Sequence, residues 1–348
     1  MKRTIVFLLT LILLLPALYS INKEKMEKWI TIISEKDPQV KMQKLEEFQK
    51  EYGDKDDQLT KLMYLHLAIT SFQVQKFDKT ITYGEQSLTY KDVSDTDKLN
   101  LYLCLANAYF LTKTDLDKAY GFAEQAITMA KTIQSVSQSP LMATQYIAPA
   151  LRIQTRILDS KGKDQKTTEE ALAKASEAFK IDKSESSYKM VQTLALRLEK
   201  MGQIDQALLA YELLFQEKPS AELARAIGLI YNKKANDAKT LEFFKAAYDL
   251  QKDPKLARLL GILFNKAQDI DSALNYFAEA FILFEQAGND PDGLTQAKQT
   301  LEHLYFNVKA KDVANQEEKE RGFQELLAAA RTRLGITPQP PAPPATPG

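Results

Sequence analysis

The chain has 348 residues, enough for one large core or a long array of repeats. Lysine plus arginine equals aspartate plus glutamate, at 46 each, so general binding to nucleic acid, which needs a basic surface, is not expected. The single cysteine, Cys104, excludes an internal disulfide and leaves the redox compartment open.

Residues 1–20 have the order of features found in a secretory signal. Lys2 and Arg3 give a positive start, a run from residue 5 to 15 is almost wholly apolar, and small Ser20 offers a cleavage site. We therefore expect export to the periplasm of a Gram-negative bacterium, or secretion, with the mature chain starting near residue 21.

Two alternatives stay open for this segment. It can remain attached as an inner-membrane anchor with the rest of the chain facing the periplasm, or it can be an internal core helix. The apolar stretch 4–19 has 16 residues, whereas a spanning helix needs about 20, which favours the cleaved signal. Membrane contact is expected only if the segment is not cleaved.

Residues 21–60 predict a pair of short helices. The first has an apolar stripe at helical spacing, and the second starts with Asp37 as N-cap and Pro38 at the first helical position and ends at Gly53. The predicted stripes are Met26, Trp29, Ile30 and Ile33, then Met42, Leu45, Phe48 and Tyr52. We expect Trp29 to be a core residue rather than a ligand platform.

Residues 61–182 predict three degenerate helical pairs, at 62–88, 102–127 and 144–179. Small residues recur at the positions where paired helices approach each other closely, for example Ala106, Ala119 and Ala123 in the second pair. The loop inside the third pair, at about 159–166, is predicted to be longer than the others.

Residues 183–286 contain the same helical pair three times with a period of 33 residues. The positions in register are Leu194/Ile227/Leu260, Ala195/Gly228/Gly261, Leu198/Tyr231/Phe264, Ala207/Thr240/Ala273 and Tyr211/Phe244/Phe277. Ser187, Ser220 and Asp253 stand at equivalent places and are predicted to be helix caps. Small residues in register where helices approach, with aromatic residues filling the gaps, indicate stacked helix–turn–helix repeats.

This pattern resembles the tetratricopeptide repeat (TPR) family. The first regular copy matches best, through Val191, Leu194, Ala195, Leu198, Gly202, Ala207, Tyr211 and Pro219. The middle copy departs from the pattern, with Thr240 for alanine and Asp237 for an apolar residue. The resemblance implies an all-α fold, a right-handed α-solenoid of stacked pairs, acting as a protein-binding scaffold.

Residues 287–335 predict a terminal cap, because the last repeat of a solenoid must cover its apolar face. A turn over residues 288–293 is followed by one long amphipathic helix carrying Leu294 to Val308 and by a second carrying Phe323 to Leu334. The tail, 336–348, is rich in proline and alanine and is predicted to be disordered or polyproline II.

No catalytic or metal-binding constellation is found in the sequence. His66 and His303 are far apart and lack partners at metal-ligand spacing, and Cys104 lies in a helix near nothing that would lower its pKa. We therefore predict no metal, no cofactor and no enzymatic activity, with an unrecognised enzyme as the third and least favoured function.

The TPR resemblance further implies that the first helix of each pair lines a concave groove. The inward positions are Lys189, Gln192, Leu196, Glu199 and Lys200 in the first copy, Glu222, Arg225, Leu229, Asn232 and Lys233 in the second, and Lys255, Arg258, Ile262, Asn265 and Lys266 in the third. Seven of these are basic and two acidic. The charges either solvate an exposed face or form the rim of a groove.

We expect the groove to have an apolar floor of Leu196, Leu229 and Ile262 and a cationic rim. Such a groove suits a peptide or protein segment with acidic residues. The predicted function is an exported, non-enzymatic scaffold, and the alternative is a membrane-tethered assembly or chaperone-like factor.

Overall fold

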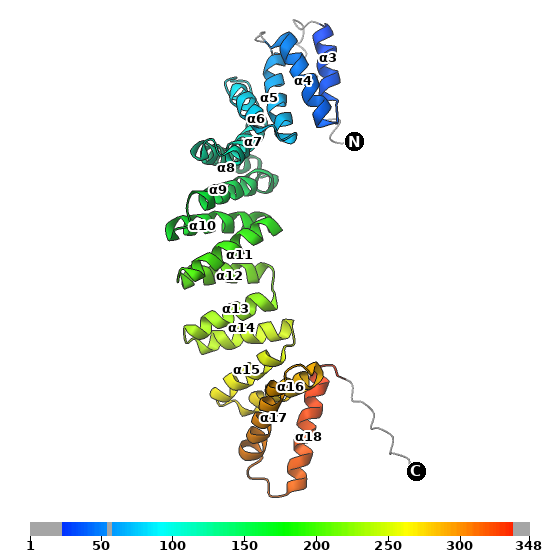
Figure 1. The fold of residues 1–348 in the computed structure, drawn as a ribbon, viewed down its shortest axis with the longest axis vertical. Helices are drawn as coiled ribbons and strands as arrows, with labels where there is room; N and C mark the ends of the chain where they lie inside the picture. Colours follow the sequence, from blue (N-terminus) through cyan, green and yellow to red (C-terminus); the bar gives the residue numbers. More distant parts are fainter. Residues whose placement is uncertain (1–22, 54–57, 337–348) are drawn as a thin grey trace, which may run out of the picture. The chain divides into compact units, whose positions relative to one another are not determined.

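A computed structural model of the protein describes residues 23–53 and 58–336. Sixteen α-helices and two five-residue π-helical segments make up this part of the chain, and no strand occurs in it (Figure 1). The all-α fold predicted from the repeats is confirmed, with the helices stacked as a solenoid. The predicted signal segment and all but the first residue of the predicted tail lie outside the described residues.

The chain divides into two compact units between Gln203 and Ile204, and each unit is described by itself. The first contains α3 (Lys23–Ile33), α4 (Pro38–Tyr52), α5 (Gln58–Gln73), α6 (Phe77–Leu88), α7 (Asp95–Thr112), α8 (Leu116–Ser137), the π-helical η1 (Ala143–Ile147), α9 (Ala148–Lys161), α10 (Gln165–Asp182) and α11 (Glu185–Lys200). The second contains α12 (Ile204–Glu217), α13 (Ala221–Lys233), α14 (Asp237–Leu250), α15 (Pro254–Lys266), α16 (Ile270–Ala287), α17 (Pro291–Leu304), the π-helical η2 (Tyr305–Lys309) and α18 (Gln316–Arg333).

In the first helical pair, α4 starts at Pro38 and is followed by Gly53 as predicted, but the buried face of α3 is rotated from the predicted stripe. Asp37 caps α4 by accepting from the backbone N–H of Gln39, and Trp29 is buried against the rings of Phe48 and His66. The prediction for Ile30 was wrong, because it is 43% exposed while Ile32 is buried. The buried face of α3 instead includes Lys25, whose ammonium lies over the rings of Phe48 and Tyr52.

The predicted caps of the regular repeats are confirmed at two of three places. Ser220 and Asp253 accept hydrogen bonds from the backbone N–H groups of Leu223 and Leu256. At the third place the prediction was wrong, because Ser184 caps α11 and Ser187 lies one turn inside the helix. The Ser187 side chain is buried and shares a hydrogen bond with Ser184 Oγ, so it supports the capping residue from inside the first turn.

The prediction of a long loop at 159–166 was also wrong. Helix α9 continues to Lys161, and Asp164 already caps α10, so the connection has three residues, as in the α7–α8 turn. Because the side chain of Asp164 accepts from the backbone N–H of Thr167, the second helix starts earlier than the apolar pattern suggests.

The C-terminal helices cover the last repeat, with two differences from the prediction. Gly288 ends α16 in the left-handed conformation, but Gly293 lies inside α17 and not in the turn. The predicted long helix stops at Leu304 and continues only as η2, which leaves Val308 exposed. Phe323, Leu327 and Ala330 of α18 pack into one cluster with α16 and α17 residues.

Among the helices within residues 23–53 and 58–336, none is both long and apolar enough to cross a membrane.

Candidate functional site

The predicted site residues lie on three first helices: α11 in the first unit, and α13 and α15 in the second. All of them are exposed or half-buried. Leu196, Leu229 and Ile262, the residues predicted to form an apolar floor, keep 45%, 46% and 49% of their surface exposed. Large apolar side chains recur at this solvent-facing position in all three regular copies.

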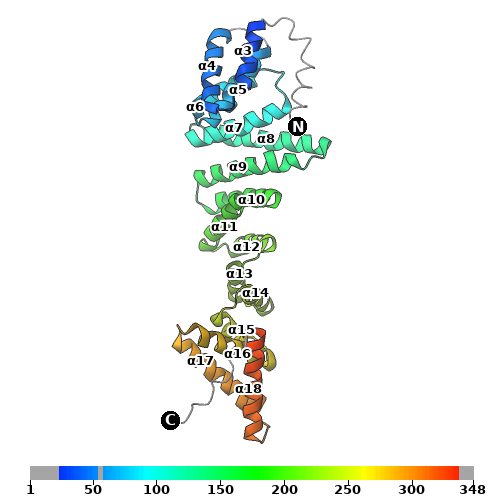
Figure 2. The same ribbon diagram turned by 90° about the vertical axis from the view of Figure 1, so that its right-hand side faces the viewer.

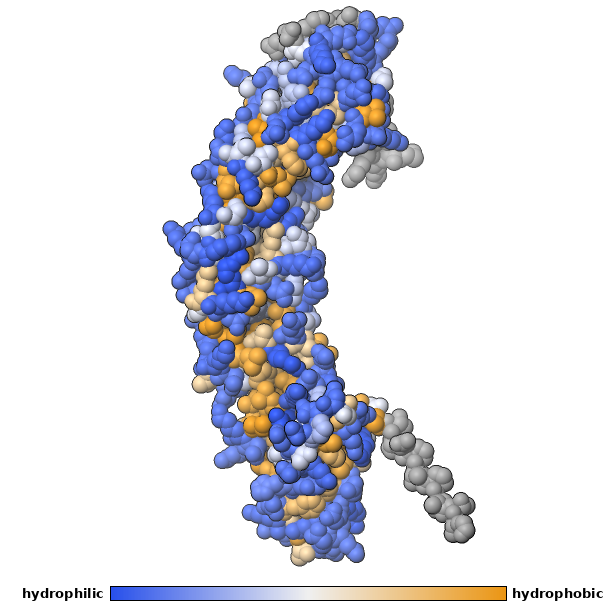
Figure 3. Space-filling view, viewed as in Figure 1, coloured by the Kyte–Doolittle hydropathy of each residue, from blue (hydrophilic) through white to orange (hydrophobic). Residues whose placement is uncertain are grey.

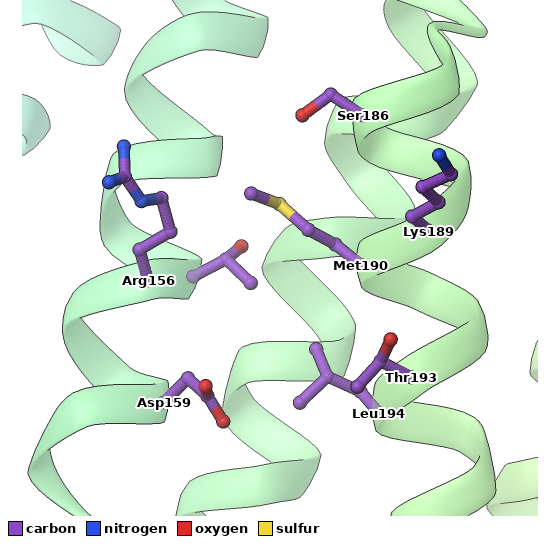
Figure 4. A pocket seen from close by; sticks show the side chains of 8 residues that line it. Arg156, Asp159, Ser186, Lys189, Met190, Thr193 and Leu194 are labelled. Carbon is purple, nitrogen blue, oxygen red and sulfur yellow. The ribbon is translucent and has the colours of Figure 1, made fainter.

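In the first unit, α9 and α11 enclose a pocket of about 370 Å³ (Figure 4). Met190 reaches from α11 toward α9, where Arg156 and Asp159 lie (Figure 4). The full lining is Thr155, Arg156 and Asp159 from α9 with Ser186, Lys189, Met190, Thr193 and Leu194 from α11. Lys189 was predicted from the sequence, whereas the α9 residues were missed because their repeat has no clear register.

Charged groups at this pocket are held in different ways. The Asp159 carboxylate accepts from Lys163 at 2.7 Å and from Arg197. Burial would raise the pKa of Asp159, but these two hydrogen bonds outweigh burial and hold the pKa below its usual range. The guanidinium carbon of Arg156 lies 4.5 Å from the ring centroid of Phe110. The ammonium of Lys189 lies 3.8 Å from the carboxylate of its helix neighbour Glu185, a long and exposed ion pair.

Two cations in the second unit face aspartates that cap the next first helix. Arg225 of α13 lies 3.3 Å from Asp253, the N-cap of α15, and Lys255 of α15 lies 3.3 Å from Asp290, the N-cap of α17. The pKa of Asp290 is held below its usual range by the backbone N–H of Gly293 and then by Lys255. These cations therefore tie successive first helices together.

Two further predicted cations of the second unit, Arg258 and Lys266, differ in how they are paired. Lys266 lies 2.8 Å from Asp237, whereas Arg258 donates to the neutral side-chain oxygen of Gln296. The charge excess counted from the sequence is thus reduced by three aspartates outside the counted positions. Arg258 differs from Arg225, Lys255 and Lys266, because its hydrogen-bond acceptor is an amide, and its charge also helps to lower the pKa of Asp290. It shares α15 with the half-exposed Ile262.

Apolar side chains reach the surface over α13–α15 on the face shown in Figure 3, among hydrophilic ones. Leu229 and Ile262 are half-exposed, and the exposed positions one turn away on α13 and α15 are polar, for example Arg225 and Asn265. The apolar residues of such a surface can contact apolar side chains of a partner, and its polar residues can bind the partner's backbone and charged groups.

The pKa values of Cys104 and His66 are both shifted so that the uncharged side chain is favoured. Burial raises the pKa of the Cys104 thiol to about 12 and lowers the pKa of His66 to about 4. Within residues 23–53 and 58–336, no group of three or more His, Cys, Asp or Glu side chains is placed to hold a metal ion.

No family model matches the chain, and no curated protein does. Solved structures are similar in fold. YrrB, described as a TPR protein with an unusual peptide-binding site, is 16% identical, with a TM-score of 0.36 over 61% of this chain and 94% of that one. TTC0263, a thermophilic TPR protein of Thermus thermophilus, is 17% identical, with a TM-score of 0.25 over 69% and 98%. The apo form of RapI is 12% identical, with a TM-score of 0.41 over 90% and 100%.

Proposed function

We propose that the protein is an exported, non-enzymatic scaffold that binds a peptide or protein segment on the faces of its first helices. The observation that carries the proposal is the pocket between α9 and α11. Its volume of about 370 Å³ falls in the range of natural ligand sites. Export rests on the features of residues 1–20, and an uncleaved segment would make the same scaffold membrane-tethered.

The pocket combines an apolar interior with cations at its edge. Met190 and Leu194 supply apolar surface, and Arg156 and Lys189 supply positive charge on opposite sides. Asp159 is already bound by Lys163 and Arg197 and therefore does not repel an incoming carboxylate as a bare charge would. A peptide with an apolar side chain next to Asp or Glu satisfies both features.

The second unit offers a similar combination on α13 and α15. Leu229 and Ile262 give apolar contacts one repeat apart. Arg258 is the cation best able to bind a carboxylate, since its hydrogen-bond acceptor is an amide and the nearby Asp290 acts on it only through its charge. Arg225 is less available, because a bound peptide would have to compete with Asp253. We therefore expect Arg258 to contribute more than Arg225 to the binding of acidic peptides.

A titration with defined peptides tests the proposal. The chain starting at residue 21 is titrated with fluorescein-labelled decapeptides that alternate leucine with glutamate, and with matched peptides that alternate leucine with lysine. We expect the glutamate series to bind. Arg156→Ala/Lys189→Ala should weaken binding about a hundredfold or more, because each of the two charge-assisted hydrogen bonds contributes about 1.5–3 kcal/mol.

The matched control removes two exposed lysines of α10, Lys166→Ala/Lys180→Ala, which changes net charge equally but leaves the pocket intact. A second comparison sets Arg258→Ala against Arg225→Ala, with the larger loss expected for Arg258. Equal binding of both peptide series, or equal losses in the pocket and control variants, would refute the proposed acidic preference. No binding of either series would count against the peptide-binding surface itself.

A further inference from the structure

Helix α8, with 22 residues, is the longest of the described helices. The α8–α9 hairpin reaches past the end of α10 on one side (Figure 2). The projecting part, residues 133–142, is called the hairpin tip below. It lies within a run of 20 residues, 132–151, that contains no Asp, Glu, Lys or Arg, although these types make up 26% of the chain.

Two large apolar side chains are exposed at the hairpin tip. Val136 is 84% exposed and Leu141 is 56% exposed. The base of the tip is anchored, since Ile133 and Met142 pack against the buried cluster formed by α7–α10. Val136 and Leu141 are therefore held outward by a packed base and are not part of a fold-stabilising core.

The tip has a defined backbone conformation. Gln138 is left-handed, with φ 52°, and its N–H donates to Gln134 O at 2.8 Å. Two further bonds close the turn, from Met142 N to Ser139 O and from Ser139 N to Ser137 Oγ, both 3.3 Å. A surface that is already ordered loses little conformational entropy when it binds.

The first charges on either side of the uncharged run are themselves neutralised. Lys131 lies 3.3 Å from Glu177, and Arg152 is bonded to Asp182. The hairpin tip therefore presents apolar and neutral polar groups without an unpaired charge from the flanking residues of its own helices.

We propose that the hairpin tip binds the hairpin tip of a second copy of this chain, around a two-fold axis. In such a contact the same patch lies on both subunits, so charged patches repel themselves, and a patch without charge avoids this cost. A membrane surface is a poorer occupant, because no lysine or arginine lies within the run to attract anionic lipid. This inference is independent of the proposed peptide binding.

The small size of the tip sets the strength of the contact. A stable dimer buries about 800 Å² per partner, which two large apolar residues and their neighbours do not reach. We expect a weak, reversible dimer, detected by sedimentation equilibrium as a rise of the average mass toward twice the monomer mass as concentration rises to about 1 mM. Val136→Asp/Leu141→Asp should abolish this rise.

The control variant, Leu209→Asp/Leu250→Asp, places two charges on other exposed apolar residues, at 68% and 51% exposure, and should dimerise like the wild type. Ser137→Cys gives a direct second readout. Its thiol is exposed, whereas Cys104 is half-buried and its thiol has a raised pKa, so mild oxidation should link two chains through residue 137 alone. Thr295→Cys, exposed on α17, should stay monomeric under the same oxidation.

A wild-type chain that stays monomeric up to about 1 mM, or a dimer that survives Val136→Asp/Leu141→Asp, would overturn the proposal. Equal oxidative linking of the Ser137→Cys and Thr295→Cys variants would overturn the two-fold contact at the tip.

Discussion

Gly228 and Phe244 face each other so closely that the glycine has no room for a side chain. A Cβ built on Gly228 would lie 2.5 Å from Cδ1 of Phe244, and the ring is only 1% exposed. One repeat later, a Cβ on Gly261 would lie 2.9 Å from ring atoms of Phe277. The small and aromatic positions that recur every 33 residues are therefore direct neighbours in the α13–α14 and α15–α16 pairs.

Gly228→Ala should destabilise the second unit by about 1–3 kcal/mol, because the buried ring must move to admit one methyl group. The matched control is Gly121→Ala on α8, where a Cβ meets nothing within 4 Å. That change should stabilise by up to about 1 kcal/mol through helix propensity. Urea unfolding followed by circular dichroism measures both. Equal midpoints for Gly228→Ala and the wild type would show that the helical pair is not packed as described.

Arg333 ties α18 to a carboxylate that is nearly buried. Its Nε donates to Glu279 at 2.6 Å, and the Tyr248 hydroxyl donates to the other oxygen at 2.7 Å. Arg333→Met should cost about 1.5–3 kcal/mol, since Glu279 would lose its charged partner. Arg331→Met should cost almost nothing, because Arg331 meets exposed Glu285 only at 3.9 Å. Proteolysis of α18 at the same rate in both variants would contradict this role.

His66 should make the first unit lose stability in mild acid. Burial, with a smaller effect from the charge of Lys41, lowers its pKa from 6.5 to about 4, so the folded chain keeps a neutral ring. The unfolded chain binds the proton below pH 6.5, and stability falls by about 1.4 kcal/mol per pH unit down to about pH 4.

His66→Phe should therefore flatten the loss of stability between pH 6.5 and about 5. Urea unfolding at several pH values measures the slopes. Identical slopes for His66→Phe and the wild type would refute the contribution of His66.

The sequence predicted the regular part of the fold because the apolar, small and aromatic positions recur in register. It failed at two helix starts that a polar side chain decides, although it placed the caps Ser220 and Asp253 correctly. Ser184 and Asp164 start α11 and α10 through bonds to backbone N–H groups, and no apolar period reports such caps. Ile30 was misplaced because the alkyl chain of Lys25 is buried in α3, which rotates the buried face.

The candidate site was only partly predictable for a related reason. Register within the repeats identified the exposed positions of α11, α13 and α15, including Lys189. It could not show that Asp253 and Asp290 neutralise Arg225 and Lys255, because those contacts join one repeat to the next. Arg156 was missed, since the degenerate pair that contains α9 offers no register from which to place it.

Export predicts a defined N-terminus. The native protein should begin at or near Ile21, because the positive start, apolar run and small Ser20 direct cleavage there. Mass spectrometry of the protein from fractionated cells measures the start directly. An intact Met1 in a soluble cytoplasmic fraction would refute export, and an intact Met1 in the membrane fraction would support the tethered alternative.

The most direct measurement of peptide binding is to map where a bound peptide lies. A leucine–glutamate peptide carrying a photoreactive group is cross-linked to the chain starting at residue 21, and the linked residues are identified by mass spectrometry. Binding on the first helices predicts links to Met190 or Thr193 of α11 and to Leu229 or Ile262 of α13 and α15. Links confined to exposed residues of the second helices, such as Leu209 or Leu250, would contradict it.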